Sequence, residues 1–201
     1  RLGNIFGIVG MVIAIITTLM FKSVLSYVEI GAAIIVGGAI GTFIALRIEM
    51  TALPQLVAAF HSLVGIAAVF VAAAAFYDPA SFGIGTIGAI GTSSLIEMSI
   101  GTFIGAITFS GSIIAFLKLR GLMSGSPITF PGQHILNLLI LISIIILTYF
   151  LCLNQSPNFF WSLIAISFLV GFLLIIPIGG ADMPVVISML NSYSGWAAAG
   201  I

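Results

Sequence analysis

Two residues that can exchange protons or hydrogen bonds lie well inside apolar runs of the sequence. His61 follows Pro54 by seven residues, which places it about 10 Å into a predicted helix. Histidine takes and gives a proton near neutral pH, so His61 suits a station on a proton path. Asn191 lies in the polar island 189–194, where its amide can hold a water molecule or an imidazole ring. For both residues, a hydrogen bond that only joins two helices is the structural alternative.

Ser112 and Asp182 are the other two candidates. Ser112 lies deep in an apolar run that also carries Thr102, Thr108 and Ser110. Hydroxyls in such a helix either bond back to their own backbone or hold a file of water. Asp182 follows two glycines and precedes a proline-containing first turn, a pattern typical of a helix N-cap. At the mouth of a channel the same carboxylate would suit a proton collector.

The amino-acid composition indicates whether these residues belong to a water-soluble protein or to one in a membrane. The chain has 201 residues, of which 61% are hydrophobic and 5% charged, and its mean hydropathy is +1.37. Soluble domains carry about 25% charged residues, and nucleic-acid-binding proteins need a basic patch. The composition therefore excludes a soluble globular domain, a disordered chain and a partner for nucleic acid, and it indicates a protein embedded in lipid.

Seven apolar segments are long enough to span a bilayer, which takes roughly 20 residues. The segments are continuous and do not alternate, which favours helices over a β-barrel. We therefore expect an all-α fold, a polytopic transmembrane helix bundle. Three Gly-x-x-x-Gly patterns predict close packing between its helices. The expected spans are residues 2–21, 30–46, 53–76, 95–117, 135–153, 159–177 and 183–201, and the glycine patterns are 3–7, 37–41 and 101–105.

The few charges fall between these spans and predict an orientation. If side A is the side that holds Arg1, it also collects Arg47, Lys118 and Arg120 from the loops, whereas Lys22 is the basic residue of side B. Positive charges are enriched on the cytoplasmic side of membrane proteins. We therefore expect side A to be cytoplasmic, or to face the matrix in a mitochondrion.

Other local patterns predict little chemistry. Residues 83–88 match Gly-x-Gly-x-x-Gly, but they lie in a predicted loop without the strand and helix that a dinucleotide fingerprint requires. Cys152 is the single cysteine, so we expect neither a disulfide framework nor a thiolate metal site. Glu97 is interpreted as an interfacial acid on side B, and His134 as a loop residue on side A.

Three stretches of the chain resemble one protein family. They are residues 53–65, 109–116 and 179–197, and the opening residues 3–7 fit the same family. All look like the beta-subunit portion of the membrane domain of proton-translocating NAD(P)+ transhydrogenase. The similarity covers nearly the whole chain, and the motif at 179–197 is long and unusual.

The resemblance implies an activity and its partners. The family couples hydride transfer between NADH and NADP+ to inward movement of a proton, with NAD(H) and NADP(H) bound in two soluble domains. Residues 1–201 would be a transmembrane proton-conducting domain without a nucleotide or metal site of its own. Its partners would be both nucleotide-binding domains, the remaining helices of the alpha portion, the lipid bilayer and a second copy of the enzyme. The membrane would be the bacterial cytoplasmic (inner) membrane, or the mitochondrial inner membrane.

The resemblance also implies roles for the candidate residues. The channel histidine of the family falls on His61, its channel asparagine on Asn191 and its channel serine on Ser112. The acid near the face of the NADP(H)-binding domain falls on Asp182. The family has one further span at each end, and the later one leads to the NADP(H)-binding domain, so we expect this sequence to be a fragment.

Two other functions stay open on the residues alone. A secondary transporter for a small solute could use the same polar residues, and it would surround them with a cavity of roughly 300 Å³ or more. A proton channel would instead bring the spans of His61, Ser112 and Asn191 together around a narrow gap. A purely structural membrane anchor would need no histidine inside a span.

Overall fold

The computed structural model describes residues 2–20 and 26–199 of the chain. These residues form seven α-helices, which confirms the predicted all-α class. Five of the helices, α2 to α6, are long and apolar enough to cross a membrane, whereas α7 has 17 residues. The chain is a multi-pass membrane protein. It divides into two compact units, Arg1–Glu49 and Met50–Ile201.

The helices begin and end within three residues of the predicted spans. One departure is a short antiparallel hairpin in the segment predicted as a loop, in which Gly85 pairs with Ile90 and Thr86 with Ala89. The elements are α1 (Leu2–Leu19), α2 (Tyr27–Arg47), η1 (Met50–Ala52), α3 (Leu53–Tyr77), β1 (Gly85–Thr86), β2 (Ala89–Ile90), α4 (Thr92–Leu119), α5 (Gln133–Asn154), α6 (Pro157–Ile175), η2 (Gly180–Asp182) and α7 (Met183–Ala199).

The first unit consists of helices α1 and α2. The Ser26 hydroxyl caps α2 by accepting a hydrogen bond from the Glu29 N–H at 3.5 Å. Most side chains of both helices are exposed. A Cβ added to the glycines that define the patterns 3–7 and 37–41 would meet no described atom within 4 Å. The packing role predicted for these glycines is therefore not seen within the unit.

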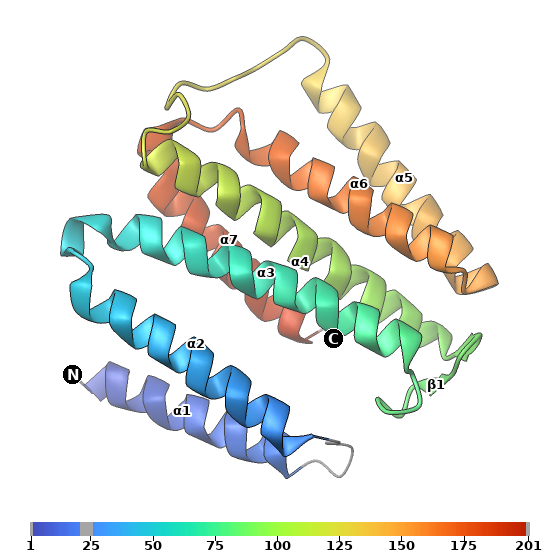
Figure 1. Ribbon diagram of the computed structural model, residues 1–201. Helices are drawn as coiled ribbons and strands as arrows, with labels where there is room; N and C mark the ends of the chain where they lie inside the picture. The colour runs from blue at the N-terminus through green and yellow to red at the C-terminus, as the bar shows by residue number, and fades with distance from the viewer. Residues whose placement is uncertain (1, 21–25, 200–201) are drawn as a thin grey trace. The chain divides into compact units, whose positions relative to one another are not determined.

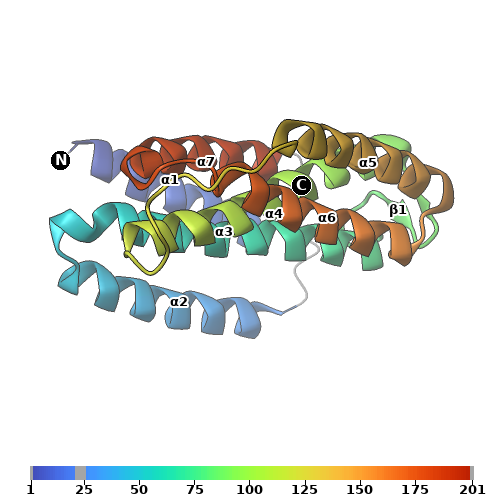
Figure 2. The same ribbon diagram turned by 90° about the horizontal axis from the view of Figure 1, so that it is seen from above.

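Helix α4 is the centre of the second unit. It packs against α3, α6 and α7, and more weakly against α5, which lies mainly on α6. In Figure 1, α4 runs between α3 and α6, and Figure 2 shows α7 on another side of it. The apolar stretch of α4 is 61% buried, against 39% or less for the other four long helices. Five hydroxyl side chains of α4 therefore lie in the interior of the unit, those of Ser99, Thr102, Thr108, Ser110 and Ser112.

Glycines bring α4 close to its neighbours at two crossings. A Cβ added to Gly65 of α3 would lie 2.5 Å from the Phe109 nitrogen and 2.6 Å from the Gly105 oxygen. Helices α3 and α4 therefore touch backbone to backbone, and Gly105, from the third glycine pattern, has the predicted packing role. A Cβ added to Gly171 of α6 would clash with the Ser110 hydroxyl of α4.

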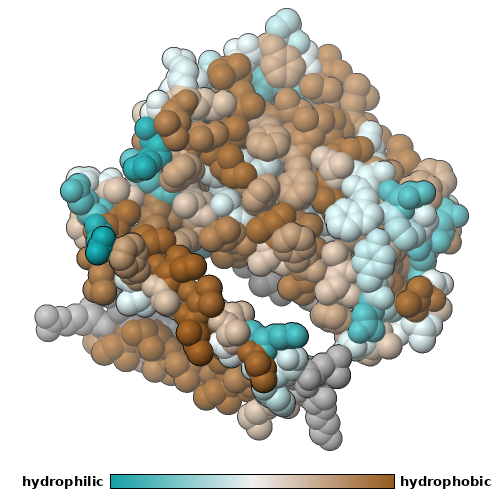
Figure 3. Space-filling model, in the orientation of Figure 1, coloured by the Kyte–Doolittle hydropathy of each residue, from teal (hydrophilic) through white to brown (hydrophobic). Residues whose placement is uncertain are grey.

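The two ends of the second unit are more polar than its middle. Figure 3 shows hydrophilic residues gathered at both ends and apolar residues between them. We name end A the end at which α3, α5 and α7 begin, and end B the opposite one. At end B the Trp161 Nε1–H donates to the Tyr77 hydroxyl at 2.9 Å, as expected of aromatic side chains at a membrane interface. Arg1 and Lys22, on which the charge count partly rests, lie outside the described residues.

Candidate functional site

His61 of α3 and Asn191 of α7 lie in direct contact. The Nε2 atom of His61 is 2.7 Å from the Oδ1 atom of Asn191, although the residues are 130 positions apart. The Nδ1 atom of the same ring is 2.7 Å from the backbone oxygen of Val57, one turn earlier in α3. His61 is partly buried and Asn191 exposed at the surface of the second unit. We call these two residues the His–Asn pair.

The contacts of the His–Asn pair depend on protonation. Both ring nitrogens of His61 face oxygen atoms that can only accept. A protonated imidazole has two N–H donors and satisfies both oxygens, whereas a neutral ring has one donor. In the neutral state one ring nitrogen therefore faces an acceptor, unless the Asn191 amide turns and presents its NH₂ group. The orientation of the Asn191 amide is thus linked to whether the His61 ring carries one proton or two.

Close packing on α4 holds the two helices of the pair in place. The crossing of Gly65 and Gly105 lies one turn after His61 on α3. On α7, Leu190 packs against α4, since a Cβ added to Gly111 would lie 3.6 Å from its Cδ2 atom. Leu190 directly precedes Asn191, so both members of the pair lie next to a tight contact with the same central helix.

Three buried hydroxyls of α4 have no hydrogen-bond partner among the described residues. They belong to Thr102, Thr108 and Ser112, and each side chain is 0% exposed. The Ser110 hydroxyl, by contrast, donates to the Ala106 oxygen at 2.9 Å, the usual bond within a helix. Buried polar groups are rarely left unpaired, so these three hydroxyls differ from the self-bonded Ser110. Ser112 makes no described hydrogen bond to the His–Asn pair.

Asp182 lies apart from the pair, at end A. It is exposed and ends the 3-10 turn η2, directly before α7. Its backbone N–H donates to the Gly179 oxygen at 3.1 Å, but its carboxylate makes no hydrogen bond to the described residues. The structure therefore gives no capping bond from this carboxylate. Nine residues separate Asp182 from Asn191, about 13 Å along a helix.

Lys118 and His134 lie in different surroundings from those predicted. Lys118 was expected in a loop, but it lies in the last turn of α4 and is 5% exposed. Position 118 follows the buried Gly111 by seven residues and Ala115 by three, and this helical spacing could have revealed its burial. His134, predicted as a loop residue at the start of a helix, is exposed and lies in the first turn of α5.

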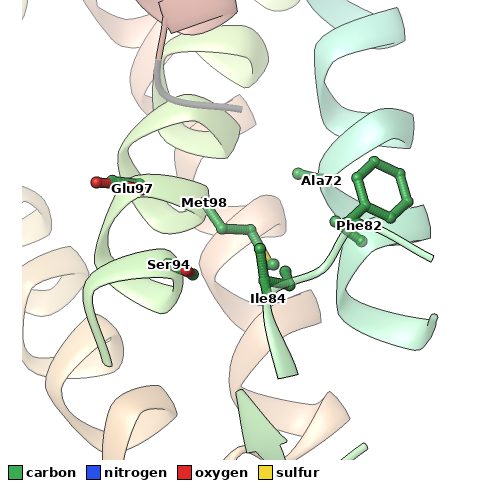
Figure 4. A pocket seen from close by; sticks show the side chains of 7 residues that line it. Ala72, Phe82, Ile84, Ser94, Glu97 and Met98 are labelled. Carbon is green, nitrogen blue, oxygen red and sulfur yellow. The ribbon is translucent and has the colours of Figure 1, made fainter. Parts of the chain in front are cut away.

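Three cavities in the described residues lie away from His61, Ser112 and Asn191. One of about 450 Å³ at end A is lined by residues 129–135 and Pro177, and one of about 200 Å³ lies between α1 and α2. One of about 80 Å³ at end B lies beside Glu97 and Met98, and in Figure 4 Met98 faces Phe82 and Ile84 of the loop. None of the three is lined by His61, Ser112 or Asn191, so none is the solute cavity that the transporter alternative requires.

Comparisons with known proteins agree with these features. The family model of the NAD(P) transhydrogenase beta subunit matches residues 1–201. Two sequences of NAD(P) transhydrogenase subunit beta from Rhodospirillum rubrum, one of them from a designated strain, are 61% identical over all 201 residues. The match covers 43% of each relative, so the chain spans less than half the length of the curated relatives. The chain belongs to the NAD(P) transhydrogenase beta subunit family.

Proposed function

We propose that this chain is the proton-conducting membrane part of an NAD(P) transhydrogenase, which couples hydride transfer between NADH and NADP+ to proton translocation. The observation that carries the proposal is the contact of 2.7 Å between His61 and Asn191, each the ninth residue of its apolar helix. An ionisable side chain at such a place is costly in lipid and is usually functional. Membership of the transhydrogenase family names the reaction that a proton path here would serve.

His61 is the proton station in this proposal. When the ring holds two protons, it donates to Val57 and to Asn191. When the Nε2 proton leaves, the Nδ1–H bond to Val57 persists and the Asn191 amide rotates to donate to Nε2. The rotation avoids an unpaired acceptor, which would cost about 1–3 kcal/mol. Movement of the proton and the orientation of Asn191 are therefore linked.

The buried hydroxyls of α4 are further polar groups along the proposed proton path. Thr108 and Ser112 are four residues apart and lie on one helix face. Their hydroxyls, without partners in the described residues, can each bind water and pass a proton along it. Ser112 lies next to Gly111, which packs against α7 just before Asn191. This places its hydroxyl at about the depth of the His–Asn pair.

The proton gradient supplies the free energy. Moving one unit charge across the membrane is worth about 2.3 kcal/mol per 100 mV, and in this proposal the gradient acts on His61, the ninth residue of α3. Asp182, at end A beside the start of α7, is the residue on which we expect the NADP(H)-binding domain to act. End A then faces the cytoplasm of a bacterium, or the matrix of a mitochondrion.

The partners in the proposal are those that the hydride reaction needs. Hydride transfer requires separate domains for NAD(H) and NADP(H), and the membrane part supplies no atom to it. The remaining membrane helices of the alpha portion complete the bundle, and the complete enzyme is a dimer. Lipid covers the exposed apolar faces of α2 to α6.

Reconstitution of the complete enzyme tests this function. The full beta subunit and its partner subunits are placed in sealed liposomes with a pH-sensitive dye, and NADH and NADP+ are added outside. We expect NADPH formation together with a change in internal pH, and a protonophore should abolish the pH change while hydride transfer continues. Hydride transfer without any pH change would contradict the proposed proton path. An absence of hydride transfer would contradict the proposed transhydrogenase activity.

Asn191→Leu tests the site within that enzyme. The substitution removes the partner of the His61 Nε2 atom, and a loss of 1–3 kcal/mol corresponds to roughly 5- to 150-fold in the coupled rate. Ser188→Ala, which changes an exposed hydroxyl one turn earlier on α7, should keep the native rate. Equal rates for the two variants would contradict the role of Asn191.

A further inference from the structure

Lys118 is a buried cation that binds only backbone oxygens in the described residues. Its Nζ atom donates to the oxygens of Ile176 and Ile178 at 2.6 Å each, and more weakly to that of Ser126 at 3.5 Å. Two of these acceptors belong to the connection between α6 and α7, residues 176–182, and the third to the loop after α4. One ammonium group therefore ties the end of α4 to the segment that leads into α7.

A charge at this place is not needed for packing. Burying an ammonium away from water is costly, and a hydrophobic side chain of similar size often serves the fold as well. The site offers partial compensation, because α6 ends at Ile175 and the last carbonyls of a helix carry negative partial charge. The hydrogen bonds of Lys118 thus hold the α6–α7 connection close to the end of α4.

The next residue of α4 binds the start of α3. The Gln55 side-chain amide donates to the Leu119 oxygen at 3.2 Å. The last turn of α4 therefore contacts both the first turn of α3 and the connection that leads into α7. Gln55 lies six residues before His61, about 9 Å along the helix. Ile178 lies five residues before α7 begins at Met183. We call the contacts of Lys118 and Leu119 with these two segments the end-A clamp.

The contact between His61 and Asn191 depends on how α7 is positioned relative to α3, and the end-A clamp fixes that position. The contact between His61 and Asn191 is 2.7 Å long, and a hydrogen bond is lost beyond about 3.5 Å. Movement of α7 relative to α3 by about 0.8 Å along the line of the contact, or by about 2.2 Å at right angles to it, is therefore enough to break it. A stiff helix carries such a movement from its first turn to Asn191.

We propose that Lys118 is a positioning residue that holds α7 in register with α3, so that displacement of the α6–α7 connection at Asp182 reaches the His–Asn pair. The connection carries the acid that faces the nucleotide-binding domain in the proposed function, on which this inference rests. Lys118 touches neither member of the pair. It acts on the pair indirectly, by fixing the position of the segment that leads into α7.

Three variants of the complete enzyme test the inference. Lys118→Met keeps the length of the side chain but removes all three hydrogen bonds, and we expect protons moved per hydride transferred to fall roughly fivefold or more. Lys118→Arg keeps charge and donors, and should restore at least half of the native ratio. Arg120→Met is the matched control, since it removes a cation two residues away that is exposed, and it should keep the native ratio.

A spectroscopic measurement tests the same inference without catalysis. In ¹⁵N-histidine-labelled enzyme, the His61 signals are those missing from the spectrum of His61→Ala. We expect Lys118→Met to shift the Nε2 signal because the contact with Asn191 opens, whereas Lys118→Arg and Arg120→Met should leave it in place. An unshifted signal in a folded Lys118→Met protein would overturn the inference, and so would an equal shift in Arg120→Met. If native enzyme moved no protons but these shifts occurred, the proposed function would fail and the positioning role would stand.

Discussion

Replacing Gly65 by alanine places a methyl group where α3 and α4 touch. The new Cβ would lie 2.5 Å from the Phe109 nitrogen and 2.6 Å from the Gly105 oxygen, both backbone atoms that cannot turn away. Ordinary contact begins at 3.4 Å, so the helices must separate by about 0.9 Å. If α3 moves by that amount along the line of the His61–Asn191 contact, the distance rises from 2.7 Å to about 3.6 Å, beyond hydrogen-bonding range.

Two measurements follow from this geometry. Overpacking of this kind costs about 1–3 kcal/mol, which should lower the unfolding temperature of the solubilised enzyme. The number of protons moved per hydride should fall as well, because the His–Asn pair opens. Gly171→Ala is the matched control, since its Cβ overlaps Ser110 at the α4–α6 crossing and α6 carries neither member of the pair. We expect that variant to lose stability but to keep its coupling ratio.

The result that would refute this reasoning is specific. If Gly65→Ala unfolded at the native temperature and kept native coupling, the backbone contact between α3 and α4 would not be as close as described. If Gly171→Ala lost coupling as fully as Gly65→Ala, general loosening of the bundle, not the position of His61, would explain the effect.

Three smaller predictions concern other contacts. Gln155→Ala removes two hydrogen bonds to the backbone of the buried Ile90, at 2.9 and 3.1 Å, and should destabilise the protein by about 1–3 kcal/mol in a denaturation assay; native stability would contradict this. Thr108→Val should slow proton-coupled transfer without lowering the unfolding temperature, because it removes a buried hydroxyl that has no described partner; an unchanged coupled rate would exclude Thr108 from the path. Tyr77→Phe removes the acceptor of the Trp161 N–H and should cost about 0.5–1.5 kcal/mol, and a native unfolding temperature would show that this bond contributes nothing.

Much of the fold could be predicted because lipid imposes a simple rule on the sequence. A span must be apolar and about 20 residues long, so the helices follow directly from the apolar runs. Prolines mark two starts, Pro54 as the second residue of α3 and Pro157 as the first of α6, because the first turn tolerates a missing N–H. The hairpin at Gly85 escaped prediction because its strands are two residues long.

The site was only partly predictable, because a sequence pattern gives a helix face and not its partner. His61 and Asn191 were identifiable as polar groups inside apolar helices, but their contact joins residues 130 positions apart. The unpaired state of Ser112 depends on the packing of neighbouring helices around α4. The predicted span ends at residue 117, so the sequence places Lys118 in the following loop; only the structure shows the carbonyl oxygens that hold it.

The most direct test of the central claim is the proton-to-hydride ratio of the complete enzyme with His61→Ala, in sealed liposomes. The matched control is Ser62→Ala, since within the described part of the chain the Ser62 hydroxyl bonds only to the Ala59 oxygen of its own helix. A positioned proton donor and acceptor contributes about 10²-fold or more, so we expect proton movement to become undetectable in His61→Ala and to stay native in Ser62→Ala. Near-native proton translocation coupled to hydride transfer in His61→Ala would contradict the claim that the path runs through His61.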